Sequence, residues 1–176
     1  MFTDTLVRWL GGLADLRDKE LIQACLSPLF DRQTSLCISS AGLAIKAGGS
    51  AIVKTGASAT ILMANGRLQS IAASTDMPAL SGTVTNAKFN VYCFFQDGGG
   101  TRTTLMGTEG ATLAAVKFPQ APLGKALIGF VIINPTGTGN FVGGTTALDD
   151  GTVTPNAVYV NAQAGFDPNC LTGLVA

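Results

Sequence analysis

The sequence predicts a mainly β protein: an antiparallel, jelly-roll-like β-sandwich that follows a short α-helical N-terminal arm. Two observations support this fold class. Residues 1–33 place leucines at helical spacing among charged side chains, whereas from Thr34 onward Gly, Ala, Ser, Thr and Val dominate. Residues 34–176 also contain short β-type runs, separated by turn residues at intervals typical of a sandwich or barrel. A chain of 176 residues is long enough for one sizeable core with an appended arm.

The N-terminal arm is expected to form two short helices. Gly11 and Gly12 separate them, because a glycine inside a helix costs about 1 kcal/mol relative to alanine. The second helix is expected at residues 18–26 and to end before Pro28, since the residue before a proline avoids the helical conformation. The arm either packs on the chain's own β domain or docks on another protein. Its candidate contact residues form one apolar stripe at helical spacing: Leu6, Trp9, Leu10, Leu13 and Leu16.

The β domain is expected to contain two hairpins and several further strands. Asn65-Gly66 predicts the turn of the first hairpin, because this pair readily adopts the two positive φ angles of a type I′ turn. Asp97, followed by three glycines, predicts the turn of the second. The expected strands are residues 36–41, 43–46, 51–54, 59–64, 67–73, 82–85, 88–96, 101–106, 112–118, 126–133 and 157–161.

Two of these strands are apolar on both faces. Residues 126–133 form a continuous apolar run, which predicts a central strand of the core. Residues 88–96 carry aromatic side chains on both faces. This pattern predicts that the core covers one face, and that the arm, a second subunit or another partner covers the other. Phe94 is therefore a candidate interface residue.

Residues 134–151 are expected to form a contact loop. They are poor in charge and in helix-forming residues, and loops of this length in compact domains usually bind a partner. Asn134 and Phe141 are its candidate contact residues. Asp149 and Asp150 leave open a bound cation, although Asp-Asp-Gly is more often a solvated turn.

The composition argues against several classes of function. The chain has no histidine, which rules out a Ser-His-Asp or Cys-His relay within it and any metal site that depends on imidazole. Eleven Lys and Arg residues balance eleven Asp and Glu residues, so neither nucleic acid nor a membrane surface is expected as a partner. The longest apolar run, residues 126–133, is far shorter than the roughly 20 residues of a membrane-spanning helix. We expect no cofactor and no catalytic site.

The cysteines are spread along the chain without a CxxC pair. This spacing argues against a zinc ribbon or a thioredoxin-like motif. Their expected role is that of small buried hydrophobic residues, and whether any of them pair is left open. They are Cys25, Cys37, Cys93 and Cys170.

Four stretches carry a resemblance to known proteins: residues 88–92 (KFNVY), 106–113 (MGTEGATL), 128–134 (IGFVIIN) and 137–141 (GTGNF). With them, residues 50–161 resemble virion proteins of tailed bacteriophages, among them head decoration (cement) proteins. The resemblance implies an accessory protein that is assembled in the host cytoplasm and binds the outer surface of the capsid. Its partners would be the major capsid protein and further copies of itself, as a dimer or trimer that reinforces contacts between capsomers. Weak contacts repeated on a symmetric lattice would supply the affinity.

Two other functions remain open at this point. A tail component, such as a fibre, baseplate or adaptor subunit, would also be β-rich and oligomeric. A carbohydrate-binding module would need exposed aromatic side chains on one sheet face, and the Trp and Tyr residues of the chain are Trp9, Tyr92 and Tyr159. An enzyme is the least supported class, because nothing in the sequence singles out a pair of carboxylates.

Overall fold

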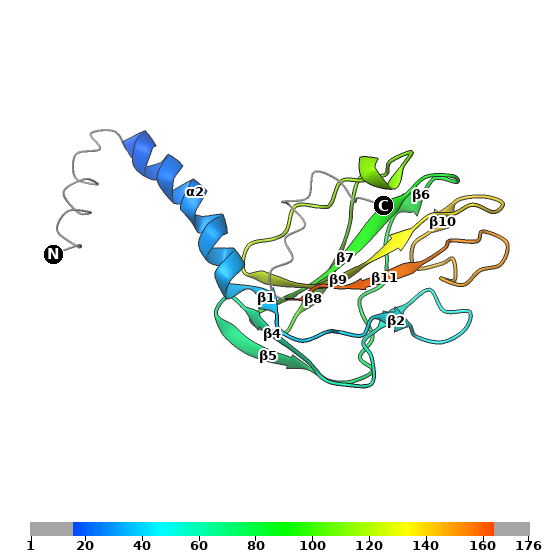
Figure 1. The fold of residues 1–176 in the computed structure, drawn as a ribbon, viewed down its shortest axis with the longest axis horizontal. Helices are drawn as coiled ribbons and strands as arrows, with labels where there is room; N and C mark the ends of the chain where they lie inside the picture. Colours follow the sequence, from blue (N-terminus) through cyan, green and yellow to red (C-terminus); the bar gives the residue numbers. More distant parts are fainter. Residues whose placement is uncertain (1–15, 164–176) are drawn as a thin grey trace. The chain divides into compact units, whose positions relative to one another are not determined.

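The structure is a computed structural model, and it describes residues 16–163 (Figure 1). The chain divides into two units, Met1–Gln33 and Thr34–Ala176. The division falls at the residue where the composition of the sequence changes. The described part of the first unit is helical, and the second unit is mainly β with antiparallel sheets.

Helix α2 (Leu16–Thr34) is longer than the sequence predicts. The prediction that the second helix of the arm ends before Pro28 is wrong, because α2 continues through this residue. A proline removes one backbone hydrogen bond, and a helix can continue when the turns on either side remain bonded. Leu16 begins α2, and its side chain is not described. The other residues of the predicted apolar stripe, and the predicted break at Gly11 and Gly12, lie outside the described residues.

The strands of the β unit form antiparallel sheets. They are β1 (Leu36–Cys37), β2 (Ala44–Ile45), β3 (Val53–Lys54), β4 (Thr60–Ala64), β5 (Arg67–Ile71), β6 (Thr83–Val84), β7 (Asn90–Asp97), β8 (Arg102–Met106), β9 (Lys125–Ile133), β10 (Phe141–Val142) and β11 (Val158–Asn161). The four-stranded sheet has the order β11-β9-β7-β8, and the three-stranded sheet has the order β1-β4-β5. Two-stranded ladders join β2 to β3 and β10 to β6.

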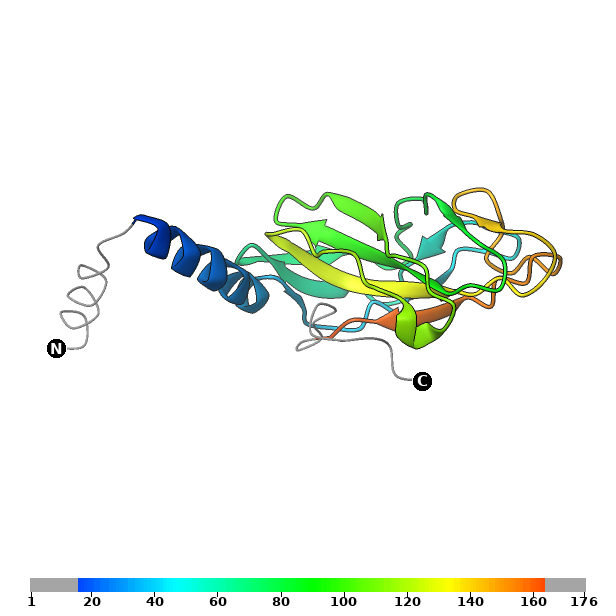
Figure 2. The same ribbon diagram turned by 90° about the horizontal axis from the view of Figure 1, so that it is seen from above.

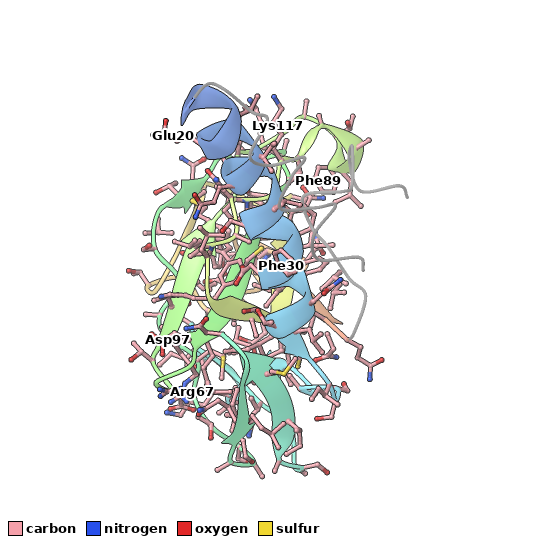
Figure 3. The ribbon with its side chains drawn as sticks, turned by 90° about the vertical axis from the view of Figure 1, so that its left-hand side faces the viewer. Glu20, Phe30, Arg67, Phe89, Asp97 and Lys117 are labelled. Atoms are coloured by element: carbon pink, nitrogen blue, oxygen red, sulfur yellow. The ribbon has the colours of Figure 1, made fainter. Side chains whose placement is uncertain are left out.

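Both predicted hairpins are present. β4 and β5 meet at Asn65 and Gly66, whose φ angles of 50° and 71° confirm the positive φ pair of the predicted turn. β7 and β8 meet at the glycine-rich turn, where the Asp97 carboxylate accepts a hydrogen bond from the N–H of Thr101 at 2.9 Å. A hydrogen bond from the side-chain amide of Gln69 joins the first hairpin to the second turn, at the end of the unit where Figure 3 shows Asp97.

The strand predicted at residues 112–118 is not formed. The chain instead makes a short 3₁₀ helix, η1 (Leu113–Ala115), followed by an isolated bridge between Thr108 and Lys117. The ring of Phe118 packs edge-on against Phe130, with centroids 5.0 Å apart. The apolar residues of this segment therefore cover a sheet rather than extend one.

β7 and β9 are buried on both faces by the β unit itself. One core contains side chains from both larger sheets, among them Cys37, Leu62, Ala64, Ile71, Tyr92, Phe94, Ile128 and Val131. The second core lies on the opposite face of the four-stranded sheet and contains Val91, Cys93, Phe95, Val116, Leu127, Phe130 and Ala162. The prediction that a partner covers one face of residues 88–96 is therefore wrong, because the segment around η1 supplies that cover.

β9 is the long yellow strand in Figure 2. The alternation of its side chains between the two cores is interrupted partway along its length, which we call a shift of phase. The side chains of Ile128 and Val131 lie in the same core although they are three residues apart. The pairing with β7 shifts its register at this point, as a β-bulge does. A Cβ at Gly129 would lie 2.5 Å from the carbonyl oxygen of Val160, so the close approach of β11 to β9 requires glycine there.

Candidate functional site

One end of the β unit is built from three loops, of which the third contacts each of the other two (Figure 1). They are the β2–β3 turn at residues 46–50, the segment after β6 at residues 85–88, and the connection between β9 and β11 at residues 134–156. We call these residues the loop platform. The third loop contains the contact loop that the sequence predicts.

The two ends of the third loop pair with each other. We call residues 134–138 its outgoing arm and residues 152–156 its returning arm. The N–H groups of Gly137 and Thr138 donate to the carbonyls of Val153 and Thr152, both at 2.9 Å. A Cβ at position 137 would lie only 2.0 Å from the carbonyl oxygen of Thr152. The close approach of the two arms therefore requires glycine at this position.

Phe141 anchors the middle of the third loop in the core. β10, which contains it, pairs with β6, and the Phe141 side chain is completely buried. Its ring lies edge-on to that of Tyr92, with centroids 6.2 Å apart. The prediction that Phe141 contacts a partner is wrong, because a side chain with no exposed surface cannot reach one.

Asn86 joins the second loop to the third. Its N–H donates to Oδ1 of Asn140 at 2.9 Å, and its side-chain Nδ2 donates to the carbonyl of Gly137 at 3.0 Å. The next residue, Ala87, has a φ of 62° and donates its N–H to the carbonyl of Pro135 at 2.7 Å. These bonds hold the outgoing arm in place.

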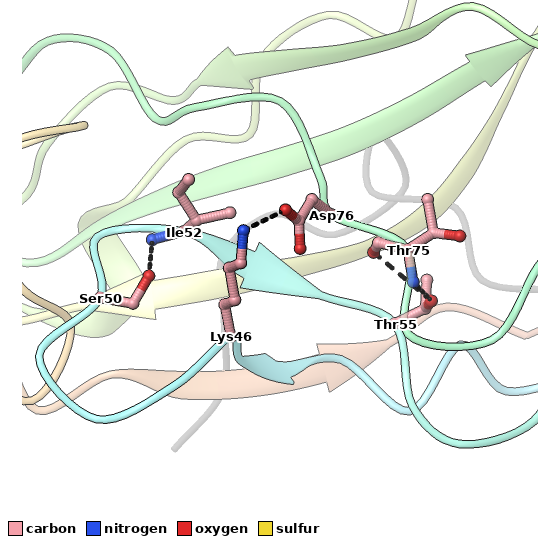
Figure 4. Close-up of polar contacts among 6 residues, drawn as sticks. All are labelled: Lys46, Ser50, Ile52, Thr55, Thr75 and Asp76. Atoms are coloured by element: carbon pink, nitrogen blue, oxygen red, sulfur yellow. Dashed lines mark hydrogen bonds and ion pairs between the residues drawn. The ribbon is translucent and has the colours of Figure 1, made fainter.

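The β2–β3 turn supports the returning side. The N–H of Gly49 lies 3.0 Å from each carboxylate oxygen of Asp149, and the N–H of Leu148 donates to the carbonyl of Ser50 at 2.9 Å. The hydroxyl of Ser50 in turn accepts from the N–H of Ile52 at 3.0 Å (Figure 4). The turn is thus fixed on both sides.

Asp150 organises the returning arm. Its Oδ1 accepts hydrogen bonds from the N–H of Val153 at 2.9 Å and of Thr152 at 2.7 Å. These two donors, Val153 first, hold the pKa of the Asp150 carboxyl below its usual value. Thr154 and Asn156 follow with φ angles of 50° and 44°, a region that a β-branched threonine rarely enters. Such a conformation persists only where the surrounding bonds fix it.

The loop platform presents a polar surface whose charges balance, because its charged residues are Lys46, Lys88, Asp149 and Asp150. Its exposed side chains include Thr136, Thr138, Asn140, Thr145 and Thr152. Within residues 16–163, no group of three His, Cys, Asp or Glu side chains could hold a metal ion. Over the same residues, no helix is long and apolar enough to cross a membrane. A rigid surface of this kind is suited to hydrogen-bonded contact with another surface.

The other predicted contact residues are not gathered at this surface. Phe94 is completely buried in the first core, so its prediction as an interface residue is wrong for the same reason as that of Phe141. Asn134 lies at the base of the loop platform and is half-buried, with its N–H bonded to the carbonyl of Pro155 at 2.8 Å. Leu6, Trp9, Leu10 and Leu13 lie outside the described residues.

Sequence reasoning missed the residues that fix the loop platform from outside the long loop. Asn86 is the clearest case, because its partners lie more than fifty positions along the chain. The sequence offers only a weak signal for such a residue. Asparagine is tolerated in turns and in left-handed backbone, so it indicates a loop, but it does not indicate which distant segment that loop contacts. Within the long loop, sequence reasoning also missed Asn156, whose side-chain Nδ2 donates to the carbonyl of Asn134 at 3.0 Å.

The structure answers two questions about single residues that the sequence left open. Cys37 and Cys93 are buried and unpaired, as expected of small hydrophobic residues, and burial raises the pKa of the Cys37 thiol to about 11. Tyr92 is completely buried and is therefore unavailable to stack on a sugar.

The fold places this chain among mainly β proteins with antiparallel sheets. None of the protein-family models, curated proteins or solved structures with which it was compared matches it.

Proposed function

We propose that this chain is a virion structural protein of a tailed bacteriophage, and that it decorates the outer surface of the capsid. The loop platform would contact the major capsid protein and reinforce contacts between capsomers, and copies of the chain would associate as a dimer or trimer. The observation that carries the proposal is the set of hydrogen bonds that fix the three loops of this surface to one another. A contact surface whose loops are already fixed loses little conformational entropy on binding.

The proposal includes the finer fold. We propose that the three-stranded and four-stranded sheets pack face to face as a jelly-roll-like β-sandwich. Side chains from both sheets support this arrangement, because they share the first core. A stiff scaffold of this kind would hold the loop platform against a capsid surface.

Electrostatic character also favours a protein lattice as the partner. The chain has no net charge, and the third loop carries only Asp149 and Asp150 as charged residues. Gly49 and the backbone of the returning arm donate hydrogen bonds to these carboxylates. Contacts through threonine and asparagine side chains are weak singly, and a lattice that repeats them raises the local concentration of the binding partner.

Cosedimentation tests the proposal. Purified chain is mixed with heads and, separately, with tails of the same phage, and the pelleted fraction is measured against concentration. A Thr138→Arg variant places a long cation on the loop platform without removing a side-chain hydrogen bond that the structure shows. Thr112→Arg is the matched control, because Thr112 is also exposed, lies beside η1 and makes no side-chain capping bond.

The expected result is saturable binding to heads that weakens by about tenfold or more in Thr138→Arg and is unchanged in Thr112→Arg. Binding to tails alone would replace the proposal with a tail component. Equal loss in both variants, or no binding to either particle, would refute the role of the loop platform.

A further inference from the structure

The turn between β4 and β5 contains a pair of residues that can react with each other. Asn65 and Gly66 are the one Asn-Gly pair in the sequence. Glycine has no Cβ, so it leaves its own backbone nitrogen unhindered, and this nitrogen can attack the side-chain amide of the preceding asparagine. The pair is therefore a candidate site of spontaneous deamidation.

The reaction transfers no electrons and needs only base and water. Base removes the proton of the Gly66 backbone N–H, and the nitrogen attacks Cγ of Asn65. A bond forms between these two atoms, the bond from Cγ to Nδ2 breaks, and Nδ2 takes up a proton and leaves as ammonia. Water then opens the resulting succinimide ring at either carbonyl, which gives aspartate or isoaspartate at position 65.

Burial does not protect this pair. Asn65 and Gly66 are both exposed, and a Cβ added at Gly66 would have nothing within 4 Å. Base and water can therefore reach the reacting atoms in the folded chain. Any resistance of the folded turn to deamidation must come from its conformation and its hydrogen bonds.

The backbone of the folded turn keeps the reacting atoms apart. Asn65 has a φ of 50°, and residues in this left-handed region have a ψ of about +47°. At this ψ the nitrogen of the next residue lies nearly opposite Cβ across the Cα–C bond, which is unfavourable for ring closure. Attack on Cγ requires ψ to rotate until the Gly66 nitrogen and Cβ of Asn65 lie on the same side of that bond.

Two residues that precede β1 hold the turn in this conformation. Helix α2 ends at Thr34 and β1 begins at Leu36, and we call Thr34 and Ser35 the α2–β1 junction. The carbonyl of Thr34 accepts a hydrogen bond from the N–H of Gly66 at 2.9 Å, and the hydroxyl of Ser35 accepts one from the N–H of Asn65 at 3.0 Å. The first bond engages the proton that base must remove. Together they fix the two peptide planes that flank the Cα of Asn65, so they resist the rotation that the attack requires.

We propose that Asn65 is a deamidation site that the α2–β1 junction controls. While the junction holds the turn, Asn65 keeps its amide; once the junction opens, Asn65 converts to aspartate or isoaspartate. When opening and closing are faster than the chemical step, the rate of conversion follows the population of the open state. Isoaspartate adds one atom to the main chain between the two N–H groups, so the junction cannot bind them again in the same geometry. The conversion therefore records that the junction has opened, and this inference is independent of the proposed function.

Peptide mapping by mass spectrometry tests this control. The wild-type chain is kept at pH 8 in buffer and, separately, in guanidinium chloride that unfolds it, and deamidation of the peptide that contains Asn65 is followed over time. Ser35→Ala removes one acceptor of the junction. Ser40→Ala is the matched control, because the hydroxyl of Ser40 also accepts a backbone hydrogen bond, from the N–H of Gly42 at 3.3 Å, outside this turn. Far-UV circular dichroism confirms that each variant folds.

The expected result is deamidation of Asn65 at least about tenfold slower in the folded wild type than in the unfolded chain. Ser35→Ala should raise the folded-state rate by about threefold or more, as the loss of one hydrogen bond predicts. Ser40→Ala should leave this rate unchanged, and all three chains should react equally fast when unfolded. Equal rates in the folded and unfolded wild type would overturn the inference, and so would equal rates in the two folded variants.

Hydrogen exchange of the Gly66 N–H supplies a second measurement that needs no variant. Guanidinium chloride at concentrations below the unfolding transition increases the population of open states. The exchange rate of Gly66 and the deamidation rate of Asn65 should then rise in proportion, because both require the bond to Thr34 to break. A deamidation rate that stays constant while exchange accelerates would show that the closed turn reacts, and would refute control by the junction.

Discussion

Replacing Phe141 by alanine separates an anchoring role of this residue from a contact role. Phe141 is completely buried and packs edge-on against Tyr92, with ring centroids 6.2 Å apart. Truncation of a buried phenylalanine costs about 3–5 kcal/mol, of which the aromatic pair accounts for about 1 kcal/mol. With a denaturant slope of about 2 kcal/mol per molar urea, the unfolding midpoint should fall by about 1.5–2.5 M.

The assay is urea unfolding followed by far-UV circular dichroism. Val142→Ala is the matched control, because Val142 lies in the same two-residue strand but is 40% exposed. A substitution at such a surface position should change the free energy of unfolding by no more than about 0.5 kcal/mol. If the two variants shift the midpoint equally, Phe141 is not an anchor of the loop platform.

Three further predictions concern the loop platform and the cores. Gly137→Ala should lower the free energy of unfolding by more than about 2 kcal/mol, because its methyl group would meet the carbonyl of Thr152 at 2.0 Å; Gly151→Ala, with nothing within 4 Å of the added Cβ, is the control in the same urea assay. The Asp150 carboxyl has its pKa held below 3.8 by backbone donors. Its contribution to stability should be complete above about pH 4 and be lost as the pH falls through the lowered folded-state pKa. An acid step in the amide proton shift of Val153 checks this, and its persistence in Asp150→Asn would contradict it. Burial raises the pKa of the Cys37 and Cys93 thiols, so neither should react with iodoacetamide at pH 8 until urea unfolds the chain; mass spectrometry of peptides from the native protein would expose an early reaction.

Local signals in the sequence predicted much of the β unit. Asn65-Gly66 defines its turn through backbone preferences that do not depend on the rest of the chain, and φ angles of 50° and 71° confirm it. The continuous apolar run of β9 likewise predicted a central strand, and the strand is buried on both faces. Such features are encoded within a few residues, so a single sequence reveals them.

Contacts between segments that are distant in sequence could not be predicted from these local patterns. Val116 and Phe118 have the spacing of a strand, but they serve as cover over the second core. Phe94 and Phe141 looked like contact residues because aromatic side chains mark interfaces and cores alike. Which of the two holds depends on segments distant in sequence, and no local pattern reports that. The residues that fix the loop platform, Asn86 above all, were missed for the same reason.

The shift of phase in β9 sets how this domain tolerates insertions and deletions. Before Gly129 the even-numbered side chains enter the first core, and after it the odd-numbered ones do. Deletion of Ile128 would remove the bulge and leave the other residues of β9 in their own cores, whereas deletion of one residue elsewhere in the strand would exchange the occupants of the two cores over part of its length. Away from the bulge, length changes in β9 should therefore be acceptable only in pairs, whereas the exposed turn at Asn65 and Gly66 should accept single residues. Homologues that keep this fold should differ in length at such turns and hold the spacing between Ile128 and Val131 constant.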